Sequence, residues 1–158
     1  MQLRALLSHL GPALRHGRRA VTSGVGLIAL TGAPSPGQVT VAVTGLRSDK
    51  GLVLACLTAR RSAFPDCRGD PAARELIVPA ARSLTLNFGA VAPGEYAVAV
   101  IHDENSNHRL DKRLMLPREG FGFSRDAAVR FGPPSFSAAA FPVGAAGAEQ
   151  SLRMRYML

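Results

Sequence analysis

Apolar and polar residues alternate with a period of two along several short stretches of the chain. The first begins at Gln38, where Val39, Val41 and Val43 fall on one face and threonine and alanine on the other. Residues 83–88 repeat this alternation. A period of two is typical of a strand with one buried face, so both stretches are predicted to be half-buried strands.

Other stretches are apolar on both faces. Residues 52–59 and 95–101 have this composition, which is typical of a central strand covered on both sides. Residues 76–78 are also apolar but end at a proline, so they predict an edge strand. Residues 136–143 and the closing run, where alternate residues are apolar from Leu152 to Tyr156, predict the last two strands.

Turn residues separate these strands. Asp49-Lys50-Gly51 predicts a hairpin between the first two strands, and Pro93-Gly94 predicts a tight turn before the strand at 95–101. About seven strands follow one another at short spacing, with no helical period of useful length between them. The pattern predicts an all-β fold, a single β-sandwich with an immunoglobulin-like or transthyretin-like Greek key. A length of 158 residues fits one domain of this kind.

The N-terminal residues read as a secretory leader. Residues 1–33 contain arginines followed by an uncharged run, and small residues precede a cleavage point after Ala33. We expect a signal peptide at 1–33, a short linker at 34–37 and the sandwich domain at 38–158, in a periplasmic or secreted protein. A retained anchor is the alternative, although residues 20–33 are fewer than the about 20 apolar residues that cross a bilayer. The mature chain is expected to have no transmembrane helix.

The positive charge changes this picture little. The formal net charge is +8, and four of the arginines lie within residues 1–33, where there is no acidic residue. The remaining basic residues are scattered and form no basic block interleaved with aromatic residues, which single-strand binding would need. The composition therefore argues against nucleic acid as a partner.

Export also determines how the two cysteines are interpreted. In an oxidising compartment, Cys56 and Cys67 are expected to form a disulfide across a loop of suitable length. Two buried free thiols are the alternative.

The candidate chemistry lies just after the strand at 95–101. Asp103, Asn105, Asn107 and Asp111 occupy positions 1, 3, 5 and 9 of a calcium-loop pattern, and alternate oxygen ligands are what a hard cation requires. Position 6 is His108, where the pattern has glycine, and position 12 is not a glutamate. Any calcium site would therefore be weak, with a Kd on the order of 10⁻⁴ to 10⁻³ M. The alternative is a loop in which Asp and Asn side chains accept hydrogen bonds from its own backbone.

Three motifs resemble a known family. His102–Asp111 reads His-Asp-Glu-Asn-x-Asn-x-x-Leu-Asp, Pro117–Ser124 reads Pro-Arg-Glu-Gly-Phe-Gly-Phe-Ser, and Pro93–Tyr96 precedes both. Together they are similar to the bacterial exported family called domain of unknown function 2141, over about residues 39–156. The resemblance implies a small periplasmic or secreted β-sandwich without an established activity. The chain departs from the family's tendency toward glycine at Ser106, His108 and Met115.

Two functions compete on this evidence. The first is a non-enzymatic binding or structural module that presents the 102–124 loop to an unknown protein, envelope or small-molecule partner. The second is a metal-dependent hydrolase-like enzyme built on Asp103, Asp111 and His102. A pocket where these groups converge favours the enzyme, whereas a loop closed by its own hydrogen bonds favours the module.

Overall fold

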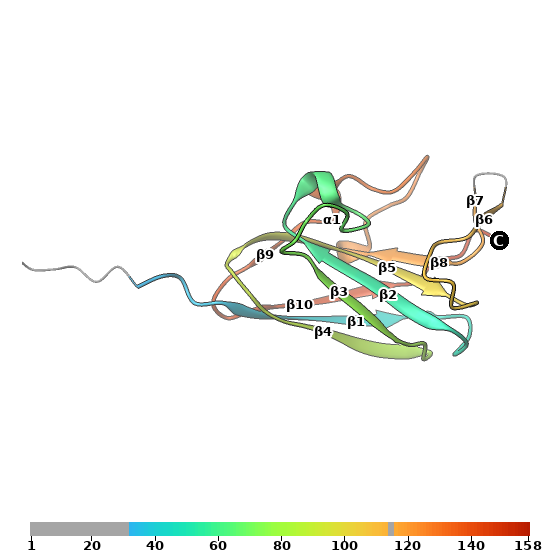
Figure 1. Ribbon diagram of the computed structural model, residues 1–158, viewed down its shortest axis with the longest axis horizontal. Helices are drawn as coiled ribbons and strands as arrows, with labels where there is room; N and C mark the ends of the chain where they lie inside the picture. The colour runs from blue at the N-terminus through green and yellow to red at the C-terminus, as the bar shows by residue number, and fades with distance from the viewer. Residues whose placement is uncertain (1–31, 114–115) are drawn as a thin grey trace, which may run out of the picture. The chain divides into compact units, whose positions relative to one another are not determined.

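The computed structural model describes residues 32–113 and 116–158, and the predicted leader lies outside the described residues except for its last two positions. Two sheets pack face to face (Figure 1), which confirms the predicted all-β sandwich. One sheet has the order β10-β1-β4, formed by β10 (Ala148–Arg153), β1 (Gly37–Thr44) and β4 (Ser83–Val91). The other has the order β3-β2-β5-β8, formed by β3 (Arg74–Pro79), β2 (Leu52–Thr58), β5 (Gly94–Asp103) and β8 (Gly120–Phe123).

Smaller elements complete the domain. Strand β9 (Phe141–Val143) pairs with the start of β5, and β6 (Lys112–Arg113) pairs with β7 (Leu116–Pro117). The helical turns are η1 (Arg61–Ala63), η2 (Ser124–Asp126) and α1 (Phe136–Ala139). No helix in residues 32–113 and 116–158 is long and apolar enough to span a bilayer.

The main core lies between the two sheets and follows the predicted alternation. Val39, Val41 and Val43 of β1 are fully buried and face apolar side chains from β2 and β5 of the opposite sheet. Leu86 and Phe88 on β4 and Leu152 on β10 fill the rest of the layer. Burial of one face of each strand is the main source of stability in such a sandwich.

A second, smaller cluster covers the outer face of β5 and β8. Phe121 and Phe123 pack there with Phe136 of α1 and Ala97 and Ala99 of β5. The two-sided burial predicted for the strand at 95–101 is therefore confirmed.

The predicted hairpin between the first two strands is wrong. Strand β1 pairs with β10 and β4, whereas β2 pairs with β3 and β5 in the other sheet. Residues 45–51 therefore cross between the sheets, with Gly45 at a φ of 77° and Leu46 buried in the core. The turn residues indicate a change of direction, but the partner of each strand is decided by packing elsewhere in the chain.

Two further segments differ from expectation. Residues 136–143 contain the short helix α1 before β9, and the Ser135 side chain accepts a hydrogen bond from the Ala138 amide at the start of α1. Strand β8 lies within residues 102–124, which were expected to be a loop. Its glycines are required by close packing, because a Cβ at Gly120 would lie 2.5 Å from the Tyr156 ring.

Candidate functional site

The connection from β5 to β8, residues 104–119, is called the β5–β8 loop below and carries three of the four predicted metal ligands, while the fourth, Asp103, is the last residue of β5. It lies at one end of the sandwich, together with the crossover at 45–51 and the last residues of the chain (Figure 1). Segments far apart in the sequence therefore meet around this loop.

Asp103 ends β5 and fixes the first turn of the loop. Its side chain has no exposed surface, and its two carboxylate oxygens accept the backbone N–H groups of Asn107 at 3.1 Å and His108 at 2.7 Å. Ser106 and His108 adopt positive φ angles of 59° and 61°. A non-glycine residue at a positive φ has a steric cost, which the Asp103 hydrogen bonds offset here.

Asp111 closes the other side of the same turn. Its two oxygens accept the side-chain amides of Asn105 at 2.8 Å and Asn107 at 3.0 Å. The hydrogen bond from Asn107, followed by that from Asn105, lowers the pKa of the Asp111 carboxyl. The amide oxygen of Asn105 accepts the Asn107 N–H, and that of Asn107 accepts the Arg109 N–H, each at 3.1 Å.

The structure thus brings all four predicted calcium ligands together, but their oxygens already accept N–H groups. A calcium ion would have to displace the amides bound to Asp103 and Asp111. Among residues 32–113 and 116–158, no group of three or more His, Cys, Asp or Glu side chains is arranged to hold a metal. The present conformation does not offer calcium a ready set of free oxygens, and weak calcium binding stays a prediction.

Glu119 is a buried residue of the site that sequence reasoning missed. One of its carboxylate oxygens accepts the Glu104 N–H at 3.1 Å and the other accepts the Asp111 N–H at 2.9 Å, so it joins both ends of the loop. Only 4% of its surface is exposed. A single glutamate in a polar stretch has no periodic signal, and its membership of the Pro117–Ser124 motif was the one available indication.

Arg47, from the crossover between the sheets, holds the outside of the loop. Its guanidinium donates to both carboxylate oxygens of Glu104, which raises the pKa of Arg47 and lowers that of Glu104. The same guanidinium lies 4.5 Å from the centre of the Tyr156 ring. A bidentate arginine–carboxylate pair fixes orientation as well as charge.

His102 is buried beneath this pair and both of its ring nitrogens are engaged. Nε2 lies 2.9 Å from the Lys50 carbonyl oxygen, which can only accept, so Nε2 carries the proton. Nδ1 of the neutral ring then accepts a hydrogen bond from the Tyr156 hydroxyl at 2.7 Å. That hydroxyl in turn accepts one from the backbone N–H of Arg47 at 3.0 Å. Neither nitrogen is free to bind a metal or to take a proton from a substrate in this arrangement.

The acidic side chains around the loop are hydrogen-bonded within the protein, whereas its basic side chains point toward solvent. The loop's three carboxylates, Glu104, Asp111 and Glu119, and that of Asp103 just before it all accept hydrogen bonds from groups of the protein itself. The four basic side chains are exposed, and none forms an ion pair with another residue of the described chain. These are Arg109, Lys112, Arg113 and Arg118. The loop therefore presents a cationic outer surface although its own net charge is close to zero.

The predicted disulfide is present. Cys56 of β2 and Cys67 are bonded with their Cα atoms 5.8 Å apart, and the described chain has no free cysteine. The bond ties residues 60–67 over the outer cluster, where the Phe64 and Phe123 rings meet edge to face.

Comparison with known proteins gives one match. No curated protein matches the chain, and no solved structure matches it. A family model described as "Uncharacterized protein conserved in bacteria" matches residues 41–151, a range that contains most of both sheets, the disulfide and the whole β5–β8 loop. The chain therefore belongs to this bacterial family of unknown function, DUF2141.

Proposed function

We propose that this protein is an exported, non-enzymatic module that presents the β5–β8 loop to a partner at the cell envelope or outside the cell. One observation carries the proposal: the carboxylates of the loop accept internal hydrogen bonds, whereas its basic side chains face outward. A loop that is ordered before binding loses little conformational entropy when a partner docks on it. Long ordered loops on a rigid sandwich are common binding surfaces.

The alternative, a hydrolase-like enzyme, has less support. It needs His102 as an acid or base and a metal at Asp103 and Asp111. Both nitrogens of His102 are hydrogen-bonded within the protein, and both oxygens of Asp103 accept backbone amides. Catalysis by these groups would require the buried network to open.

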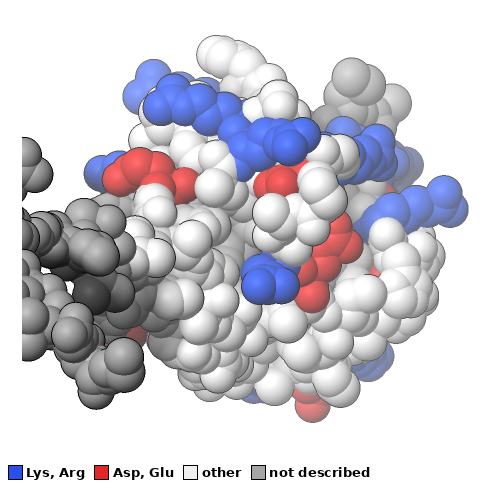
Figure 2. Space-filling view, turned by 60° about the vertical axis from the view of Figure 1, so that its left-hand side comes forward, with Lys and Arg blue, Asp and Glu red and all other residues white. Residues whose placement is uncertain are grey.

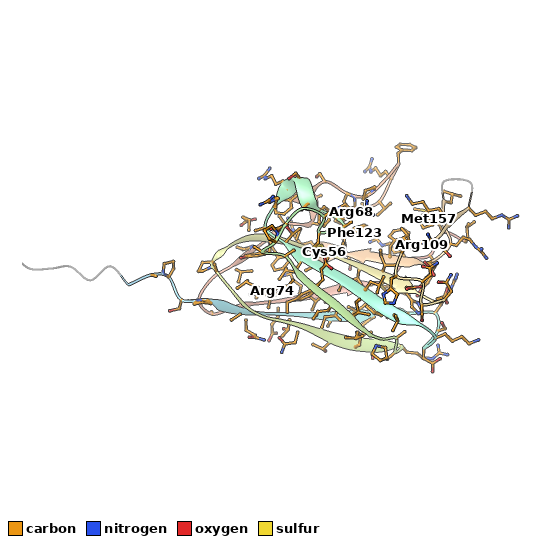
Figure 3. The ribbon with its side chains drawn as sticks, viewed as in Figure 1. Cys56, Arg68, Arg74, Arg109, Phe123 and Met157 are labelled. Carbon is orange, nitrogen blue, oxygen red and sulfur yellow. A yellow bond between two sulfur atoms is a disulfide. The ribbon has the colours of Figure 1, made fainter. Side chains whose placement is uncertain are left out.

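Site-specific photocrosslinking in the cells that produce the protein tests the proposal. A photoreactive amino acid replaces Arg109 on the loop, and Arg74 on β3 serves as the matched control. Figure 3 shows these two arginines at well-separated places on the sandwich. We expect a discrete adduct from position 109 and none from position 74. Identical labelling from both positions, or no adduct from either, would contradict the proposal.

Export has its own test. N-terminal sequencing of the protein recovered from those cells should begin near Pro34, since Ala33 precedes the expected cleavage point. A mature chain that begins at Met1 and remains in the cytosol would overturn this part of the proposal.

Calcium binding by the same loop would appear as ligand-dependent stabilisation. If the amides leave Asp103 and Asp111 to admit the ion, millimolar calcium should raise the Tm of the wild type. The variants Asp103→Ala and Asp111→Ala should then show no rise. A wild-type Tm that does not respond to calcium would exclude the weak site.

A further inference from the structure

A hollow beside the β5–β8 loop is lined by arginine and leucine side chains. It has a volume of about 420 Å³ and is lined by Arg47, Arg113, Leu116, Arg118 and Leu158. Small-molecule sites usually measure about 300–1,000 Å³, so this hollow is large enough for a small ligand. Its walls combine guanidinium groups with leucine side chains.

The three arginines do not contribute equally. Arg47 is committed to the protein: besides its pair with Glu104, it donates to the Arg118 carbonyl oxygen at 3.0 Å and to an oxygen of Leu158 at 2.6 Å. The guanidinium groups of Arg113 and Arg118 donate no hydrogen bond to any other described residue. Arg47 therefore holds the wall in place, and two positive charges are available to a ligand.

Guanidinium groups favour a ligand that carries a phosphate or a carboxylate. Arginine presents a planar set of N–H donors that matches the oxygens of a phosphate or carboxylate, and such charge-assisted hydrogen bonds are the stronger kind. Each acidic group near the hollow is already engaged: Glu104 is paired with Arg47, Glu119 accepts two backbone amides, and the last residue, Leu158, accepts a hydrogen bond from Arg47.

The apolar side of the hollow indicates what the anion is attached to. Leu116 is 45% exposed and Leu158 is 52% exposed, and the neighbouring Met157 is 40% exposed. These are three of the five large apolar side chains that the described chain exposes. Their concentration next to two unpaired arginines is unlike the single scattered apolar residues of an ordinary surface.

We propose that this hollow binds an oxyanion carried on an apolar chain, as in an alkyl phosphate or the headgroup region of an anionic lipid. The inference rests on the proposed binding function and names its ligand class. Arg113 and Arg118 bind the anionic group, while Leu116 and Leu158 cover the first part of the apolar chain.

Calorimetric titration with three soluble probes tests both halves of this ligand. The probes are octyl phosphate, inorganic phosphate and octyl glucoside, which is neutral. We expect octyl phosphate to bind at least about tenfold more tightly than inorganic phosphate, because burying a few methylene groups contributes that much. Octyl glucoside should not bind measurably. A wild-type protein that fails to bind octyl phosphate, or that binds octyl glucoside equally well, overturns the inference.

Charge-reversal variants test whether Arg113 and Arg118 bind the anionic group. Arg113→Glu and Arg118→Glu should each weaken octyl phosphate binding by about tenfold to a hundredfold, the effect of losing one charge-assisted hydrogen bond. Their Tm values should match the wild type, because neither guanidinium donates within the described chain. Arg74→Glu makes the same charge change elsewhere on the sandwich and should bind as the wild type does. Equal weakening in Arg74→Glu would mean that net charge, and not the hollow, attracts the ligand.

Vesicle sedimentation distinguishes a free ligand from a lipid surface. Binding to phosphatidylglycerol vesicles but not to phosphatidylcholine vesicles, lost in Arg118→Glu, would assign the anion to a lipid headgroup. Octyl phosphate binding without vesicle binding would assign it to a free molecule. Photocrosslinking from position 109 that persists while octyl phosphate fails to bind would leave the module standing and reject this ligand class.

Discussion

At the residue scale, a few buried carboxylates determine the shape of the β5–β8 loop. Asp103 and Glu119 together accept four backbone N–H groups that would otherwise need water in a partly buried turn. Every buried polar side-chain atom of the described residues has a hydrogen-bond partner. Removing one of these carboxylates leaves its donors unpaired, which usually costs more than the hydrogen bond itself contributes.

Replacement of Asp103 measures this effect. Asp103→Ala should lower the free energy of unfolding by about 1–3 kcal/mol, because two amide donors lose their acceptor in a buried position. Asp111→Ala should cost less, since Asp111 accepts side-chain amides that can turn toward water. Urea denaturation of both variants checks the order. An Asp103→Ala variant as stable as the wild type would contradict the assigned role.

The pair formed by Arg47 and Glu104 predicts a dependence on pH. Arg47 holds the pKa of Glu104 below its usual value of 4.5, so the ionised form is favoured by folding. The stabilisation from this pair is therefore present above pH 4.5 and is lost as the pH falls through the lowered pKa of the folded protein. Denaturation between neutral pH and about pH 3 should show a smaller loss of stability in Glu104→Gln than in the wild type. Parallel pH profiles would contradict this contribution.

The sequence predicted part of this residue-scale arrangement. Asp103 follows an apolar strand in an Asx-rich stretch, and a loop whose Asp and Asn side chains accept backbone hydrogen bonds was one of the two alternatives that the sequence offered, here with Asn107 and His108 as donors. Arg47, Tyr156 and Glu119 were not predicted to be part of the site. Their contacts join residues that are distant in sequence, and such contacts follow from the packing of the sheets rather than from local pattern.

At the scale of elements, alternation revealed strands but not their partners. β1 and β4 each bury one face, so a period of two was visible in their sequences. The alternation from Leu152 to Tyr156 found only the end of β10, which spans Ala148–Arg153. The parallel pairing of β1 with β10 carried no local signal, and the turn at 49–51 suggested a hairpin instead. The four residues of β8 alternate glycine and phenylalanine, and its glycines serve contacts with Tyr156 and Leu152 that only the folded chain creates.

The disulfide ties the turn that contains Cys67 to strand β2 and supports the outer cluster. Cys56→Ala combined with Cys67→Ala should lower the free energy of unfolding by about 2–4 kcal/mol, because the closed loop restricts the unfolded chain. The same loss should follow reduction of the wild type, while reductant should leave the double variant unchanged. Urea denaturation with and without reductant measures both. Equal stability of the oxidised wild type and the double variant would contradict a stabilising role.

At the scale of the whole molecule, the positive surface charge is related to the way the β5–β8 loop is folded. Figure 2 shows Lys and Arg side chains gathered along the upper edge of one face, with fewer Asp and Glu side chains below them. On the β5–β8 loop itself, acidic and basic side chains differ in role, because the carboxylates accept the hydrogen bonds that fold the loop and the basic side chains are exposed. A surface of this kind attracts anions through the summed field as well as through single contacts.

Native-state amide hydrogen exchange of the protein without ligand or calcium tests the central claim, that the loop is ordered by its own buried carboxylates. The account predicts slowed exchange at the four amides that donate to Asp103 or Glu119, those of Glu104, Asn107, His108 and Asp111. The amides of Asn105 and Ser106, which donate to no described residue, should exchange rapidly and serve as internal controls. Exchange of all six at the rate of an unstructured peptide would contradict the account, because the loop would then need a ligand to become ordered.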